Sequence, residues 1–175
     1  MSGALTWMAA AAVFAAPTAW GFLVARQLRQ RPLDLAAVSA ALEVLRTEIV
    51  YARTPLPDAL RRASTGAGGS AAALMREVAA QLDGGSGRGV GDLWEAALGV
   101  VDAASAWTQA DLAALARLGH ALGRSDAEDQ TRHIALCVER LRQLEDEAKA
   151  AAERQGRMWR YLGVLSGVAL VLMVR

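Results

Sequence analysis

The chain has 175 residues, of which 54% are hydrophobic but only 5% aromatic, so Ala, Leu and Val supply most of its apolar content. This composition favours helices over strands, the single cysteine excludes an internal disulfide, and a net charge of +1 gives no support to a nucleic-acid partner.

A charge-free run from Gly3 to Ala25 opens the chain. A helix of this length crosses a hydrocarbon core of about 30 Å, and Trp7 and Trp20 lie toward its ends, where indole rings favour the membrane interface. A signal peptide is the alternative, but its cationic residues precede the apolar run, whereas here they follow it. We therefore predict an N-terminal transmembrane anchor with its basic flank over residues 1–31.

Six helices are predicted between residues 32 and 158 from apolar spacings of three and four residues and from capping signals. Pro32 is expected to break the chain after the anchor, and Asp34 then caps the first helix. Apolar residues of this helix step by three and four and form one stripe, which comprises Leu35, Val38, Leu42, Leu45 and Ile49. The sixth helix meets no breaker before Gly156 and can continue into the tail. The expected helices cover residues 34–52, 55–64, 71–82, 92–104, 108–122 and 125–156.

The turns between these helices carry capping signals. Thr54 and Pro55 are typical of an N-cap followed by proline at the first helical position. Thr108 and Asp111 have the spacing of a capping box, and Gly123 is expected to end the fifth helix as a C′ glycine. Structural turn roles are thus predicted for Thr54, Pro55, Pro57, Gly123 and Ser125.

The C-terminal run Tyr161–Val174 is also charge-free but rises only roughly 21 Å as a helix. Trp159 can lie at the inner interface and Arg175 can reach outward. Arginines flank the middle of the chain on both sides, and cationic flanks stay in the cytoplasm. We therefore predict a hydrophobic membrane segment over residues 159–175, a cytoplasmic bundle over residues 32–158, and both termini outside. A tail that packs in a core or against a partner is the alternative.

The sequence offers no catalytic constellation. His133 lies one helical turn before Cys137, but two ligands fall short of the three or four of a zinc site. The glycine-rich loops lack the G-x-x-x-x-G-K-[ST] pattern of a phosphate loop, and no serine has a G-x-S-x-G setting. Acidic residues at 126–129 suit the start of a helix better than acid–base catalysis. We predict no enzyme, no metal and no cofactor.

Glu48 is a charged residue among Leu45, Ile49 and Tyr51, just before the Thr54 turn. It is expected to pair with an arginine or to cap the backbone, with partner docking as the alternative. The candidate partner-binding residues at the helix junctions are Glu48, Arg53, Asp58, Arg61, Arg62, Arg124, Asp126 and Gln130.

Three stretches resemble the stage III sporulation protein AB family: Leu45–Leu60, Leu118–Asp126 with Gln130 shortly after, and Met158–Gly167. They follow the family's order and spacing, and the resemblance spans nearly the whole chain. It implies a role in endospore formation, within a channel-like complex between mother cell and forespore. It also implies a helical domain similar to that of the inner-membrane platform proteins of type II secretion and type IV pili. The implied partners are the ATPase-like stage III sporulation protein AA and other channel subunits.

The expected protein is therefore all-α, with a cytoplasmic bundle of about six helices between an N-terminal transmembrane helix and a short C-terminal hydrophobic helix. The leading hypothesis is a non-enzymatic platform subunit in the mother-cell membrane that couples a cytoplasmic ATPase to the channel. The alternative is a membrane-tethered sensor that binds a small ligand in a sizeable apolar pocket. A homo-oligomer is compatible with both hypotheses.

Overall fold

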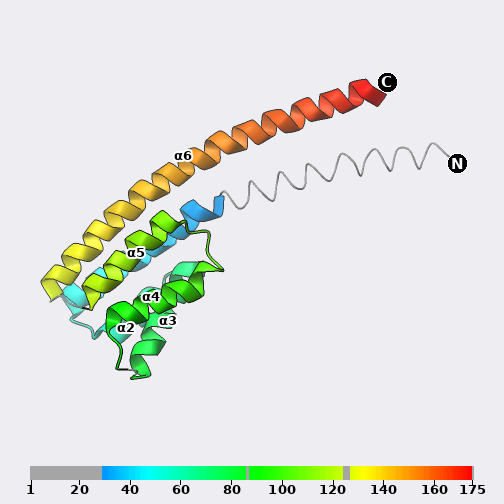
Figure 1. The fold of residues 1–175 in the computed structure, drawn as a ribbon. Coiled ribbons are helices and arrows are strands. Elements are labelled where there is room, and N and C mark those ends of the chain that lie inside the picture. The colour runs from blue at the N-terminus through cyan, green and yellow to red at the C-terminus, as the bar shows by residue number, and fades with distance from the viewer. Residues whose placement is uncertain (1–28, 86, 124–126, 175) are drawn as a thin grey trace. The chain divides into compact units, whose positions relative to one another are not determined.

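The computed structural model describes residues 29–85, 87–123 and 127–174, and all regular elements within these ranges are helices (Figure 1). Each of the six helices predicted between residues 32 and 158 has a counterpart, so the predicted all-α bundle is confirmed for the described residues. The elements are a first helix over residues 29–47, its continuation η1 (Glu48–Ala52), α2 (Leu56–Thr65), α3 (Gly69–Asp83), α4 (Val90–Asp102), α5 (Gln109–Leu122) and α6 (Ala127–Val174).

Two compact units divide the chain. Residues Arg31–Glu147 form one of them, which we call the bundle. The described part of the other unit comprises residues 29–30 and the end of α6 from Ala148. Within the described residues, no helix combines the length and the apolarity that crossing a bilayer requires. The charge-free run Gly3–Ala25 of the predicted anchor lies outside the described part, so the anchor over residues 1–31 stays a prediction.

The first helix begins before the break that the sequence suggested. Pro32 and Asp34 both lie inside it, so the predicted capping role of Asp34 is wrong. The buried Asp34 carboxylate instead accepts a hydrogen bond from the backbone N–H of Ala106 at 3.0 Å. Ala106 is 72 residues away in the sequence, and only the tertiary fold brings it to Asp34.

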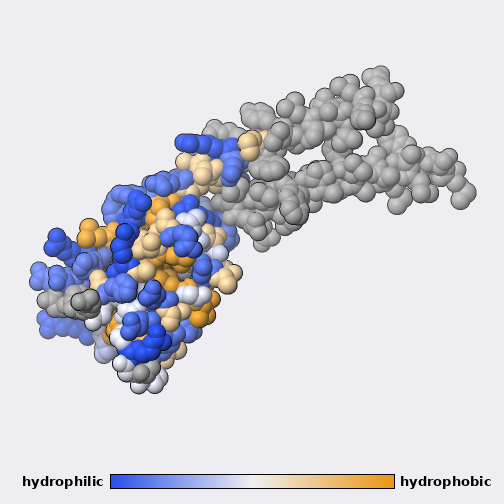
Figure 2. All heavy atoms as spheres, viewed as in Figure 1, coloured by the Kyte–Doolittle hydropathy of each residue, from blue (hydrophilic) through white to orange (hydrophobic). Residues whose placement is uncertain are grey.

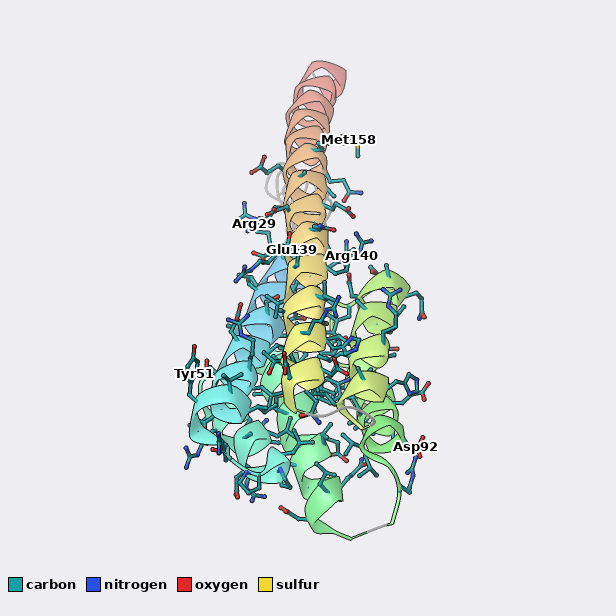
Figure 3. The ribbon with its side chains drawn as sticks, turned by 90° about the vertical axis from the view of Figure 1, so that its left-hand side faces the viewer. Arg29, Tyr51, Asp92, Glu139, Arg140 and Met158 are labelled. Carbon is teal, nitrogen blue, oxygen red and sulfur yellow. The ribbon has the colours of Figure 1, made fainter. Side chains whose placement is uncertain are left out.

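Apolar stripes of the helices meet in one core inside the bundle. Consecutive helices α2 to α5 pack in sequence order. α6 lies beside α5, where the Cys137 thiol donates to the Ala114 carbonyl at 3.7 Å, and also beside the first helix, where Arg142 lies 3.3 Å from Glu43 (Figure 3). Each fully buried large apolar side chain contributes about 1.5–3 kcal/mol. Side chains with no exposure include Leu35, Leu42, Leu45, Leu60, Leu74, Met75, Trp94, Leu115, Ile134 and Leu141.

Three glycines let the start of α4 approach the end of α5 closely. A Cβ atom on Gly119 would lie 2.4 Å from Cδ1 of the buried Trp94. A Cβ atom on Gly91 would lie 3.2 Å from Nδ1 of His120, and one on Gly123 would lie 3.1 Å from the Gly91 nitrogen. Gly123 follows α5 as predicted, but its φ of −84° is not left-handed. The close approach, and not the backbone conformation, therefore favours glycine there.

Candidate interaction surface

A widened turn ends the first helix. Residues Glu48–Ala52 form a π-helical turn, and Arg53 follows it in the left-handed region with φ 47° and ψ 36°. The N–H groups of Arg53 and Thr54 both donate to the Glu48 carbonyl, the latter at 3.1 Å. A left-handed conformation costs a non-glycine residue about 1–2 kcal/mol. Strained residues cluster at functional sites, and π-helical turns are frequent there.

The Glu48 carboxylate holds this turn against α2. Its Oε2 atom accepts hydrogen bonds from Thr54 Oγ1 at 2.7 Å and from Arg62 Nη1 at 3.0 Å. The Glu48 side chain is only 18% exposed, whereas that of Arg62 is 62% exposed. The expected pairing of Glu48 with an arginine is thereby observed. A docking role for the same carboxylate stays a prediction.

The turn into α2 differs in detail from the prediction. Pro55 occupies the N-cap position, so α2 begins at Leu56 and Pro57 lies in its first turn. Thr54 does not cap the helix, because its hydroxyl group donates to Glu48 instead. The reason is the carboxylate of the preceding helix, which offers Thr54 a charged acceptor.

A second ion-paired group joins α2 to α3. The guanidinium of Arg61 donates to the carboxylates of both Asp58 and Asp83. The hydrogen bond to Asp58 is the main reason why the pKa of Arg61 is raised above its ordinary value. All three side chains are about half exposed, so solvent screens these pairs and each adds little stability. Of the two pairs, the one with Asp83 links α2 to α3.

Apolar and unpaired cationic side chains project from the same turn. Tyr51 is 84% exposed and Val50 is 41% exposed, and Figure 3 shows Tyr51 pointing away from the bundle. Arg53 is exposed, and within the described residues no carboxylate lies within ion-pair distance of it. The sequence pointed to Arg53 but not to Tyr51. Ile49 is the buried residue of η1 and the last residue of the apolar stripe. Tyr51 lies outside that stripe, which was the available sequence signal for its exposure.

We call this region the η1–α2 corner. It comprises the turn around Glu48, the projecting side chains of Val50, Tyr51 and Arg53, and the ion-paired start of α2. On the face seen in Figure 2, hydrophilic residues of the bundle surround hydrophobic patches. The η1–α2 corner contains Glu48, Val50, Tyr51, Arg53, Thr54, Asp58, Arg61 and Arg62.

The remaining predicted site residues come between the end of α5 and the first turn of α6 in the sequence. Arg124, Ser125 and Asp126 lie outside the described residues. The Gln130 side chain donates from Nε2 to the Leu122 carbonyl at 2.9 Å. Gln130 thus connects the start of α6 to the last turn of α5, which gives it a structural contact that the sequence did not predict.

Another polar cluster lies where the bundle begins. The Arg31 guanidinium donates from Nε and Nη2 to the two carboxylate oxygens of Asp111, at 2.8 and 2.9 Å. The Thr108 N–H also donates to Asp111, at 2.7 Å, which confirms the predicted capping box. Burial of Asp111 disfavours its charge, but the hydrogen bonds from Arg31 and Thr108 outweigh burial and hold its pKa below the ordinary value.

Reactive groups in the described part of the chain are few. Burial raises the pKa of the Cys137 thiol to about 12, so it stays protonated at neutral pH. No group of three or more His, Cys, Asp or Glu side chains among the described residues could hold a metal ion. Trp94 and other large apolar side chains are fully buried in the bundle, and the hypothesis of a ligand-binding sensor stays a prediction. The surface groups are suited to recognition through charge and apolar contact.

Comparisons with known proteins agree with the resemblance seen in the sequence. The family model of stage III sporulation protein AB matches residues 6–174. Stage III sporulation protein AB of Bacillus subtilis (strain 168) is 30% identical over 158 residues, which cover 90% of this chain and 92% of that protein. A solved structure of stage III sporulation protein AB superposes with a TM-score of 0.66 at 29% identity, covering 71% of this chain and 97% of the other.

Proposed function

The chain belongs to the stage III sporulation protein AB family, and we propose that it is a non-enzymatic platform subunit whose bundle engages a cytoplasmic ATPase during spore formation. Family membership makes it a sporulation protein. Its proposed activity is protein recognition, and its proposed partner is the ATPase-like stage III sporulation protein AA. Other subunits of the channel between mother cell and forespore are further partners in this proposal.

The η1–α2 corner is the observation that carries the proposal. Hydrogen bonds to Glu48 hold its backbone, while the side chains of Tyr51 and Arg53 project into solvent. Tyr and Arg are among the residue types that contribute most to protein–protein binding energy. A preorganised surface loses less entropy on binding than a flexible one. The corner therefore suits the docking of a folded partner.

A membrane location is part of the same proposal. The charge-free run Gly3–Ala25 would anchor the chain in the mother-cell membrane, and the run Tyr161–Val174 would enter the membrane from the same side. The bundle would then face the mother-cell cytoplasm with both termini outside. Cysteines introduced singly at Ser2, at the exposed Arg140 and at Arg175 test this topology by labelling in intact cells. Labelling of Ser2 from the cytoplasm would overturn it.

A direct binding measurement tests the platform proposal. The full chain is reconstituted into nanodiscs and titrated with purified stage III sporulation protein AA. We expect saturable binding that a doubly substituted chain, with Glu48→Lys and Asp58→Lys, weakens at least tenfold. A chain with Glu139→Lys on the exposed face of α6 is the matched control and should bind normally. Absence of binding by the folded unsubstituted chain would overturn the proposal.

A further inference from the structure

Resting on the proposed function, we propose that Tyr51 and Arg53 are the principal contact residues of the η1–α2 corner, and that they receive a carboxylate beside an apolar side chain of the partner protein. Both residues project from the widened turn at the end of η1.

The bundle leaves the Tyr51 side chain almost uncovered. It is the most exposed large hydrophobic side chain among those described, at 84%, and the neighbouring Val50 is 41% exposed. The backbone of the π-helical turn that carries Tyr51 is held in place, because the N–H groups of Arg53 and Thr54 both donate to the Glu48 carbonyl. A rigid turn therefore presents an aromatic ring to solvent, where it offers a large apolar contact at low entropic cost.

Among the arginines of the η1–α2 corner, Arg53 is the one that forms no ion pair with a described acidic residue. Glu48 is engaged by Arg62 at 3.0 Å. Glu43, one turn earlier, is engaged by Arg46 at 3.2 Å and by Arg142 at 3.3 Å. Because the nearby carboxylates already have cationic partners, an incoming carboxylate is the complementary group for Arg53.

The left-handed conformation of Arg53 strengthens this assignment. Glycine adopts φ 47° without steric cost, whereas arginine does not. The position nevertheless carries a long cationic side chain, and no ion pair with a described residue compensates for the strain. Strain of this kind is a feature of binding sites whose side chain has a role beyond the fold.

A protein surface fits these observations better than an anionic membrane. Electrostatic binding to lipid headgroups uses clusters of about four to eight Lys or Arg residues. At the η1–α2 corner, by contrast, Arg61 and Arg62 are already paired with Asp58, Asp83 and Glu48. A single free guanidinium beside an exposed tyrosine is the composition of a protein-binding hot spot.

Photo-cross-linking in sporulating cells tests the contact on the full chain. Benzoylphenylalanine replaces Tyr51, which keeps an aromatic ring at the site, and mass spectrometry identifies the cross-linked peptide. We expect a protein adduct whose peptide carries Asp or Glu near the cross-link. Its yield should fall at least about tenfold with Arg53→Glu. Arg140→Glu is the matched charge reversal and should leave the yield unchanged. Arg140 belongs to α6 and, in the view of Figure 3, lies on the side of that helix away from Tyr51.

Arg53→Gly separates loss of contact from loss of folding. Glycine suits the left-handed conformation, so this variant keeps the turn while it removes the side chain that carries the guanidinium. The adduct yield should fall with Arg53→Gly as it does with Arg53→Glu. The inference would be overturned by a lipid adduct, by a cross-linked peptide without acidic residues, or by an adduct yield that neither Arg53 variant lowers.

The identity of the cross-linked protein separates this inference from the proposed function. An acidic, Arg53-dependent peptide from stage III sporulation protein AA supports both. An acidic, Arg53-dependent peptide from another protein supports the contact but contradicts the proposed partner. Normal binding of the ATPase to nanodiscs by chains with Tyr51→Ala or Arg53→Gly contradicts the contact while leaving the proposed function intact.

Discussion

The two carboxylate oxygens of Asp111 each accept a hydrogen bond from the guanidinium of Arg31, at 2.8 and 2.9 Å. Asp111 is fully buried, whereas the Arg31 side chain is 24% exposed. The pair joins the start of the first helix to the first turn of α5. It therefore connects these two helices inside the bundle.

Arg31→Met should destabilise the bundle by about 3 kcal/mol. The variant leaves the Asp111 carboxylate buried without its cationic partner, which costs more than the ion pair itself contributes. Guanidinium unfolding of the full chain in detergent, followed by circular dichroism, measures the change. Arg29→Met, at an exposed position of the same helix, is the control and should change stability by less than about 0.5 kcal/mol. Equal effects of the two substitutions would contradict this role of Arg31.

The Asp111 pair should also make stability depend on acid pH. The pKa of Asp111 is lower in the folded state than the value of about 3.9 for an unfolded aspartate. Below that value the unfolded state binds the proton more readily, so the stabilisation is complete above about pH 4 and is lost as the pH falls through the folded pKa. Unfolding free energies between pH 2 and 5 should have a shallower pH dependence for Asp111→Asn than for the natural chain. An unchanged slope would contradict the lowered pKa.

Gly119→Ala should destabilise the bundle by about 3 kcal/mol, because the added methyl group meets the buried Trp94 ring at 2.4 Å. Thermal and guanidinium unfolding measure the loss. Gly99→Ala in α4 is the control, since a Cβ atom there meets nothing within 4 Å. This substitution should stabilise the helix by about 0.5–1 kcal/mol. Combining Gly119→Ala with Trp94→Leu should cost less than the sum of the two single substitutions. Strict additivity would show that the two residues do not meet.

Cys137 should resist thiol reagents in the folded chain. Its thiol is buried and its pKa is raised to about 12, so little thiolate is available at pH 8. Reaction with a maleimide should be at least about a hundredfold slower than in guanidinium. Rapid labelling of the folded chain would show that α6 separates from α5 in solution. For this reason the topology experiment uses introduced cysteines instead of Cys137.

Local signals predicted most of the fold. The apolar spacing of Leu35, Leu42 and Leu45 identified the buried face of the first helix, and the spacing of Thr108 and Asp111 identified the start of α5. Both signals act within a few residues of the chain. The capping role predicted for Asp34 was wrong because a distant residue decides its contact: its hydrogen-bond partner lies 72 residues away in the sequence.

The candidate site was predicted less completely than the fold. Glu48 stood out as a charge beside an apolar stripe, and its pairing with an arginine was expected. Which arginine pairs with Glu48 depends on how α2 packs against the first helix, and the exposure of Tyr51 depends on the π-helical turn. Neither follows from helical periodicity, because the extra residue of a π-turn shifts every later side chain around the helix axis.

The fraction of stage III sporulation protein AA that sediments with membranes is the most direct test of the platform role. It is measured in sporulating cells with the chain present, deleted and restored. The proposed function predicts that the ATPase sediments with membranes when the chain is present, is released by deletion, and returns on restoration of the natural chain. The same membrane-bound fraction in all three strains would contradict the claim that this bundle is the site on which the ATPase assembles.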